Sequence, residues 1–237
     1  MTRIVNNCVA LVCLCLFWGQ SLRAADASHS EQIKWGNESV FNEEHNTLGL
    51  FSGVLGGQIV LAGGTSDDYS RWGRNAVCLS ENAGFALYED VLSKPLAYGA
   101  SITLSDGILC IGGRDSSQCY KDVFLVTMQQ GKLNVSEDWP PLPFPLSNAA
   151  GALLDNKVYL FGGRKSVSPS RLSDSFFVLD LSNKSRGWKE LPGYPGCVRE
   201  DAILVVQNNG VSPCLYLLGG QTETEEGLSS CLTDGYV

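Results

Sequence analysis

The chain has 237 residues, a length that fits one large domain or two small ones. Hydrophobic residues make up 44% of it and charged residues only 18%, which excludes intrinsic disorder and favours an apolar, strand-rich protein. The net charge of −8 argues against a phosphate-neutralising surface, so no nucleic-acid partner is expected.

The N-terminal segment has the pattern of a secretory signal peptide. Arg3 precedes an uninterrupted apolar run, Cys8–Trp18, and Ala25-Asp26-Ala27 has the small-x-small form of a cleavage site. Eleven apolar residues are too few to cross a hydrocarbon core that needs about 20, so an uncleaved anchor is the weaker alternative. A lipoprotein is also a weaker alternative, because Ala10-Leu11-Val12 lacks the small residues expected immediately before a lipidated Cys13. We therefore predict a signal peptide over 1–27, a periplasmic or secreted protein, and no stable membrane insertion after cleavage.

Six of the nine cysteines follow this segment, a number that permits disulfides without making the chain a disulfide scaffold. Cys110 and Cys214 lie in apolar runs and are expected to pack as small hydrophobic residues. The sequence has no CxxC pair, and neither a metal nor a cofactor is expected.

The 26 glycines are the compositional outlier, and their positions reveal a repeat. Four apolar runs end in Gly-Gly doublets, which are 49, 50 and 57 residues apart and close at Gly64, Gly113, Gly163 and Gly220. Turn residues precede each run, and another strand-like segment precedes each turn. Each repeat is therefore predicted to open with a β-hairpin whose second strand ends in the doublet.

The first strands of these hairpins are predicted at Leu48–Val54, Tyr98–Leu104, Asn148–Leu154 and Ala202–Gln207. Third strands are predicted at Asp122–Met128 and Ser175–Leu181, followed by segments that contain Trp139 and Trp188. A unit of about 50 residues with four short strands is typical of a kelch blade in a β-propeller. In such a fold the doublets allow close approach of the backbone, and the two tryptophans pack between blades.

The predicted fold class is therefore all-β, a kelch-type β-propeller over 28–237. Repeats are expected near 48–97, 98–146, 147–198 and 199–237, of which the first is irregular and the last incomplete. Trp35 precedes the first hairpin as though it belonged to the fourth strand of another blade.

The chain from Trp35 to Val237 resembles the cyclically permuted mutarotase group of kelch proteins, related to bacterial N-acetylneuraminate (sialic acid) mutarotases or epimerases. The resemblance is carried by LAYGASITLSDGILCIGGRDS from Leu96, PPLPFPLSNAAGALLDNKVYLFGG from Pro140, LDLSNKSRGWKELPGYPG from Leu179 and the terminal LTDGYV. It implies blades of a six-bladed ring, and four doublets then predict about four blades of an open or incomplete ring.

The resemblance also implies a sugar substrate and anomer interconversion, an isomerase reaction. Ring opening needs a base for the anomeric hydroxyl proton and an acid for the ring oxygen. Glu200 is the candidate catalytic carboxylate. A sialic acid carries a carboxylate that arginine binds well. The candidate substrate-binding residues, placed at doublet ends or at the starts of first strands, are Arg114, Arg164, Arg199, Tyr98 and Asn148.

Two alternatives remain open at this stage. The segment that follows the first doublet lacks the Asn-Phe-Pro and His/Asp-containing stretch of the family, so the chain could have lost its activity. A non-catalytic kelch module that binds a glycan or a protein partner is the second interpretation, because this fold hosts many unrelated functions. The arginines also have a structural alternative, as hydrogen-bonding groups between blades.

Overall fold

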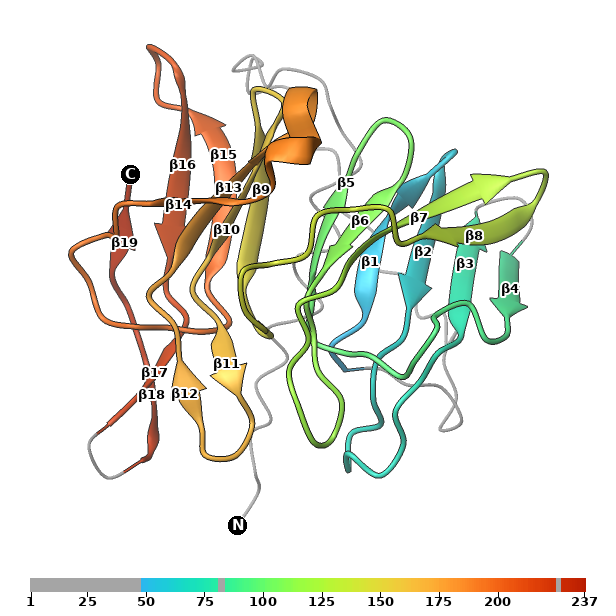
Figure 1. Cartoon of the computed structure of the whole chain (residues 1–237), viewed down its shortest axis with the longest axis horizontal. Coiled ribbons are helices and arrows are strands. Elements are labelled where there is room, and N and C mark those ends of the chain that lie inside the picture. Colours follow the sequence, from blue (N-terminus) through green and yellow to red (C-terminus); the bar gives the residue numbers. More distant parts are fainter. Residues whose placement is uncertain (1–47, 81–83, 225–226) are drawn as a thin grey trace, which may run out of the picture. The chain divides into compact units, whose positions relative to one another are not determined.

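Four antiparallel sheets follow one another along the chain in the computed structural model, which describes residues 48–80, 84–224 and 227–237 (Figure 1). The chain divides into two compact units, 1–39 and 40–237, and all the described residues lie in the second. The segment 1–27 and Trp35 therefore fall outside them, and the signal peptide stays a prediction. Within the described residues, no helix is long and apolar enough to span a membrane.

Each sheet is one blade, and its strands lie mostly in sequence order. Blade one comprises β1 (Phe51–Leu55), β2 (Gln58–Ala62), β3 (Ala76–Ser80) and β4 (Gly84–Tyr88). Blade two comprises β5 (Ala100–Thr103), β6 (Ile108–Ile111), β7 (Val123–Gln129) and β8 (Lys132–Ser136). Blade three comprises β9 (Ala150–Leu154), β10 (Lys157–Phe161), β13 (Phe176–Asp180) and β14 (Lys189–Leu191). Blade four comprises β15 (Ile203–Asn208), β16 (Pro213–Leu218) and β19 (Gly235–Tyr236).

Two small hairpins and one short helix complete the described fold. The hairpins extend from blades three and four: β11 (Arg164–Ser166) pairs with β12 (Arg171–Leu172), and β17 (Gln221–Glu223) pairs with β18 (Ser229–Cys231). The 3₁₀ helix η2 (Leu181–Arg186) follows β13.

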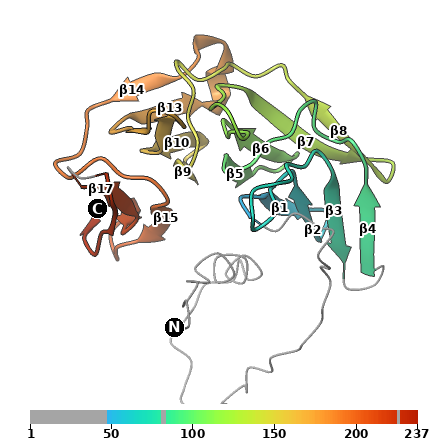
Figure 2. The ribbon, with the colours of Figure 1, turned by 90° about the horizontal axis from the view of Figure 1, so that it is seen from below.

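The blades stand side by side along an arc, with the first strand of each toward its inner side (Figure 2). These inner strands contact one another in order, β1 with β5, β5 with β9 and β9 with β15. The predicted all-β propeller of four blades is confirmed. The third and fourth strands of the irregular first repeat, which the sequence did not place, are β3 and β4.

The core consists of apolar clusters between consecutive blades. Strand β6 lies between two such clusters, and its four residues are all buried. Ile108 and Cys110 pack toward blade one, whereas Leu109 and Ile111 pack toward blade three. Because side chains alternate across a strand, a sheet covered on both faces must be apolar along its whole length. Trp139 and Trp188 pack in the cluster between blades two and three, as predicted.

Glycine doublets make this close stacking possible. The second glycine of a doublet donates its N–H to a carbonyl of the next blade, at 2.8 Å from Gly113 to Leu146 and at 2.8 Å from Gly163 to Arg199. The first glycine lies directly against the same carbonyl, and a Cβ at Gly112 would overlap the Leu146 oxygen. Both doublet positions also have positive φ. The doublets are architectural, as expected.

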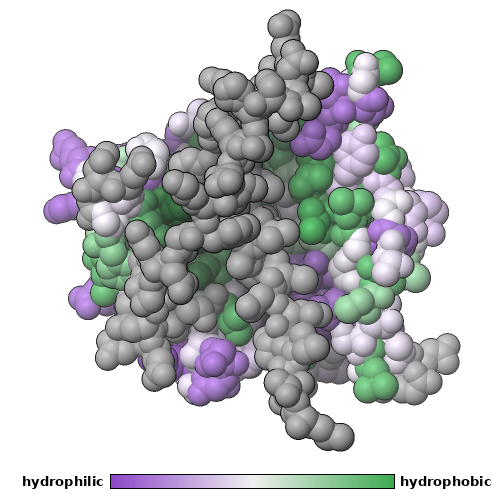
Figure 3. All heavy atoms as spheres, turned by 180° about the vertical axis from the view of Figure 1, so that it is seen from behind, coloured by the Kyte–Doolittle hydropathy of each residue, from purple (hydrophilic) through white to green (hydrophobic). Residues whose placement is uncertain are grey.

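Blade four has one apolar face that no described residue covers. Ala150 and Phe161 of blade three are buried beneath blade four, with exposed fractions of 7% and 3%, whereas the matching residues Ile203 and Leu218 of blade four are exposed by 45% and 43%. Apolar side chains are visible on that side of the molecule in Figure 3.

Cys214 lies on this same face, on β16, and is half-buried rather than buried as the sequence suggested, because no further blade covers it. Cys110, by contrast, is fully buried. All six cysteines of the described residues are free thiols.

The role of the doublets predicts a stability difference between two glycine substitutions. Gly112→Ala should lower the free energy of unfolding by at least about 2 kcal/mol, because the new methyl group must displace the backbone of the next blade. Gly131→Ala also adds a side chain at positive φ but meets nothing within 4 Å, so it should cost only about 1 kcal/mol. Denaturant unfolding of both variants measures the difference, and equal losses would contradict the close-approach explanation.

Candidate functional site

The inner ends of the four blades are joined by a row of backbone hydrogen bonds. Gly49, Tyr98, Asn148 and Asp201 each precede a first strand by two residues, and all four have positive φ, between 53° and 65°. Each of the last three donates its N–H to the carbonyl of the preceding one, at 2.7, 2.6 and 3.0 Å in chain order. We call these four residues the mouth row. The repeated backbone geometry holds side chains of different chemistry at equivalent places on neighbouring blades.

Three members of the mouth row adopt a conformation that costs a non-glycine residue energy. Asn and Asp tolerate positive φ, but tyrosine at 59° is strained by about 1 kcal/mol or more. The hydrogen bonds between blades hold Tyr98 in place despite this cost. Strained residues of this kind concentrate at functional sites, so the mouth row is the first candidate for one.

Arg114 lies beside the mouth row within a frame of three aromatic rings. Its guanidinium carbon is 4.8 Å from the ring centre of Tyr98, 5.1 Å from Trp72 and 6.0 Å from Tyr69. The three rings also contact one another at centroid distances of 6.4 Å. The backbone of Arg114 bridges to Ala97, next to Tyr98, which brings the end of one doublet beside the mouth row.

No hydrogen bond joins the Arg114 guanidinium to any described residue. Cation–π contacts stabilise its charge but leave its N–H donors without acceptors. Arg114 is half-buried beside these rings. Because the local dielectric constant there is lower than in water, a charge-assisted hydrogen bond to its guanidinium would be stronger than in bulk solvent. An anionic group with two oxygens is the natural complement to this arrangement.

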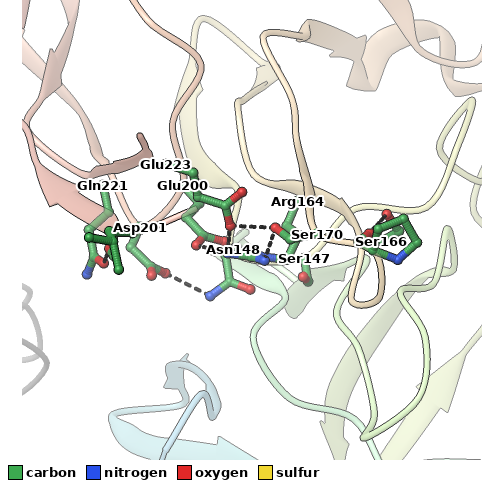
Figure 4. A network of polar contacts seen from close by, with 12 residues as sticks. Ser147, Asn148, Arg164, Ser166, Ser170, Glu200, Asp201, Gln221 and Glu223 are labelled. Atoms are coloured by element: carbon green, nitrogen blue, oxygen red, sulfur yellow. Dashed lines mark hydrogen bonds and ion pairs between the residues drawn. The ribbon is translucent and has the colours of Figure 1, made fainter. Parts of the chain in front are cut away.

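Arg164, the equivalent residue of blade three, is instead fully paired (Figure 4). Its Nε donates to Glu200 Oε2 at 2.8 Å, and its Nη2 donates to the other oxygen of the same carboxylate. Glu223 lies 3.1 Å from Nη2, and Ser170 accepts from Nη1. Both side chains of the Arg164–Glu200 pair are largely buried. This network links blade three to blade four. Both carboxylate oxygens of Glu200 accept hydrogen bonds from Arg164.

Asn148 and Asp201 face each other at the mouth row, beside this network (Figure 4). Asn148 donates from Nδ2 to Asp201 Oδ1 at 2.9 Å. Although Asp201 is open to solvent, the protein around it raises the pKa of its carboxyl by desolvation, and the Asn148 hydrogen bond opposes this. Asp201 was not among the residues predicted from the sequence.

Arg199 lies away from the mouth row, in the interior. Its side chain is fully buried, Nη1 and Nη2 bond both oxygens of Asp234 at 2.7 and 2.8 Å, and Nη1 also donates to the carbonyl of Gly219. Nε donates to Tyr194 at 2.8 Å. In the described structure Arg199 therefore anchors the C-terminal strand to blade four, the structural alternative considered for the arginines.

The structure thus brings Tyr98, Asn148 and Arg114 together at one end of the inner strands, with the Arg164–Glu200 pair beside them. Sequence reasoning missed Asp201, although superposing the repeats on Tyr98 and Asn148 would have found it. It also missed Tyr69 and Trp72 as partners of Arg114. They lie in the irregular loop after the first doublet, which no repeat could align.

A small cavity lies between blades one and two, away from the mouth row. Core residues such as Leu92 and Phe124 line it, together with the charged residues Lys94, Asp122 and Glu137. Lys94 and Asp122 form an ion pair at 2.7 Å. The cavity therefore offers no cation free of an ion pair, unlike the site at Arg114 among the described residues. No cluster of three or more His, Cys, Asp or Glu side chains suited to a metal occurs among the described residues.

Comparison with known proteins agrees with this architecture. Residues 145–192, which cover blade three, match the model of the Kelch motif. The chain contains a Kelch motif. A solved structure described as the structure of YjhT matches with a TM-score of 0.61 and 14% identity, over 79% of this chain and 64% of the other, and it supports the fold alone.

Curated relatives extend the comparison. An N-acetylneuraminate epimerase of Vibrio cholerae serotype O1 is 31% identical over 106 residues, 45% of this chain and 25% of the relative. An N-acetylneuraminate epimerase of Haemophilus influenzae is 30% identical over 101 residues, 43% of this chain and 24% of the relative. The predicted resemblance is confirmed as partial homology, and the aligned segment spans about a quarter of the length of these relatives.

The Arg199–Asp234 pair predicts a pH dependence of stability. Hydrogen bonds from Arg199 hold the pKa of Asp234 at about 2, below the usual value of about 3.9. Because the folded-state pKa is the lower one, the pair stabilises the fold above pH of about 4, and this contribution disappears as the pH falls toward 2.

In Asp234→Asn the free energy of unfolding should therefore decrease less between pH 5 and 2 than it does in the unaltered protein. Urea unfolding at several pH values measures this decrease in both proteins. Other carboxylates with lowered pKa, such as Asp68 and Asp115, titrate equally in both proteins and cancel in the comparison. Identical pH profiles for the two proteins would contradict the assigned role of Arg199.

Proposed function

We propose that the mouth row and Arg114 bind an acidic sugar of the sialic acid class, and that the chain acts on its anomeric centre as a mutarotase. The observation that carries this proposal is the half-buried Arg114 guanidinium, framed by aromatic rings and free of hydrogen bonds to the described residues. The partial homology to N-acetylneuraminate epimerases supports the choice of sugar.

Arg114 suits a sugar carboxylate for a geometric reason. Its planar fork matches the two oxygens of a carboxylate, and its donors have no acceptor among the described residues. Tyr98 and Asn148, at adjacent positions of the mouth row, lie where they could hydrogen-bond sugar hydroxyls. Arg164 is bound to Glu200 and Glu223, so we propose that it holds these two carboxylates in place and does not contact the sugar itself.

Anomer interconversion requires proton transfer at two oxygens of one sugar. Glu200 is the carboxylate that the sequence suggested, and it stays a candidate for this step. Each of its two oxygens accepts a hydrogen bond from Arg164, so a substrate hydroxyl would have to compete with this ion pair. This pairing favours a positioning role for Glu200.

Binding without catalysis is the second candidate function. It is favoured by the mutual neutralisation of Arg164 and Glu200 and by the limited part of the epimerases that this chain matches. NMR of freshly released α-N-acetylneuraminate separates the two candidates. Equilibration faster than in buffer indicates a mutarotase, whereas binding without acceleration indicates a glycan-binding kelch module. Export by the N-terminal segment is also proposed here, on the apolar pattern of residues 1–27.

Arg114→Ala should weaken binding of N-acetylneuraminate about tenfold to a hundredfold, since a hydrogen bond to a charged group contributes about 1.5–3 kcal/mol. Isothermal titration calorimetry with the acid and with its methyl ester measures the effect. The unaltered protein should prefer the acid, and Arg114→Ala should lose that preference.

Arg186→Ala is the matched control for this experiment. Arg186 is an exposed arginine at the end of η2, and its removal changes the net charge equally. This variant should bind both ligands as the unaltered protein does. Retention of the preference for the acid in Arg114→Ala would overturn the assignment of the carboxylate site.

A further inference from the structure

We infer that Asp201 is the residue that exchanges a proton with the anomeric hydroxyl of the sugar bound at Arg114. The inference rests on the proposed function and assigns the chemical step within it. It differs from the expectation drawn from the sequence, which gave this step to the neighbouring Glu200.

The first argument is position. Asp201 occupies in blade four the place that Tyr98 and Asn148 occupy in blades two and three, and the three residues are joined by consecutive backbone hydrogen bonds. Its φ of 53° is the left-handed conformation that Asp tolerates. A rigid backbone therefore presents its carboxylate at the same end of the inner strands as Arg114 and Tyr98.

The second argument is the state of its oxygens. Oδ1 accepts a hydrogen bond from Asn148 at 2.9 Å, and Oδ2 has no hydrogen-bond partner among the described residues (Figure 4). In Glu200, next along the chain, both oxygens are bonded to Arg164. A proton acceptor needs an oxygen open to the substrate, and of these two carboxylates only Asp201 has an oxygen without a hydrogen bond from a described residue.

The third argument is the surrounding charge. Desolvation raises the pKa of Asp201 first, and the negative charge of Glu200 raises it further. The Asn148 hydrogen bond and the positive charges of Arg164 and Arg114 lower it. The net shift is upward, toward the operating pH, which makes the carboxylate a better base than an ordinary aspartate. Tyr98, whose pKa is also raised, stays protonated beside it.

The step balances without a cofactor. Asp201 takes the proton of the anomeric hydroxyl, and the O–H electron pair forms the carbonyl bond as the bond between the anomeric carbon and the ring oxygen breaks. The released pair stays on the ring oxygen, which takes a proton from a water molecule. The proton on Asp201 then returns to the hydroxide that this leaves. Reclosure on the other face of the carbonyl by the reverse sequence gives the other anomer.

Asp201→Asn tests the assignment, because Asn keeps the shape and tolerates positive φ but cannot accept the proton. We expect the calorimetric dissociation constant for N-acetylneuraminate to stay within about threefold of that of the unaltered protein. The acceleration of anomer equilibration over the rate in buffer, measured by NMR, should fall at least about 100-fold. Asp106→Asn is the matched control. It removes one carboxylate from an exposed turn between β5 and β6, and both binding and rate should be unchanged.

Asn148→Ala gives a second test that keeps the carboxylate. Loss of the hydrogen bond that stabilises the charged form should move the midpoint of the pH–rate profile upward. This readout supports or overturns the role of Asp201 even where Asp201→Asn does not fold.

The outcomes separate the two proposals. A chain that does not bind the sugar refutes the proposed function. Binding without acceleration leaves the binding site standing and overturns the role of Asp201. Full acceleration by Asp201→Asn, together with loss of rate in Glu200→Gln, overturns the inference and returns the step to Glu200.

Discussion

The close approach of backbone to backbone between consecutive blades is the constraint on which the described structure depends. At each of the first three doublets a glycine donates its N–H to a carbonyl of the next blade at 2.8 Å, with its neighbour glycine in contact with the same carbonyl. A Cβ at that place would separate the sheets. The apolar clusters between blades form only because the sheets can stack this closely, since an isolated blade leaves both faces exposed.

The same constraint organises the candidate site. Stacking brings the inner strands together, and the mouth row joins them through main-chain atoms alone. Since the backbone carries the architecture, the side chains at these positions are free to differ, and they do: glycine, tyrosine, asparagine and aspartate occupy the four places. One end of the scaffold thus holds a phenol, an amide and a carboxylate together with Arg114, whose guanidinium has no hydrogen bond to a described residue.

The fourth blade shows how polar groups replace an apolar contact. Leu96 and Leu146 fill the boundary position in front of blades two and three, whereas the equivalent position in front of blade four holds Arg199. Burial of a guanidinium is tolerated there because Asp234, Tyr194 and the Gly219 carbonyl satisfy its donors. The same residue that resembles a ligand-binding arginine in the sequence therefore serves the fold in three dimensions.

The sequence by itself determined the architecture: four hairpins ending in Gly-Gly, the strand pattern of a kelch blade and the packing role of Trp139 and Trp188. These are local signals, since turn chemistry and period-two patterning depend on neighbours in the chain. Only the tertiary structure decided the pairing of charges. Arg114, Arg164 and Arg199 look alike in sequence. In the described structure, however, Arg114 lies among aromatic rings without a hydrogen bond from its guanidinium, Arg164 is bound to Glu200 and Arg199 is buried against Asp234. Trp72, Glu200 and Asp234 are each at least 30 residues away in the sequence from the arginine that they contact, and such contacts have no signature along the chain.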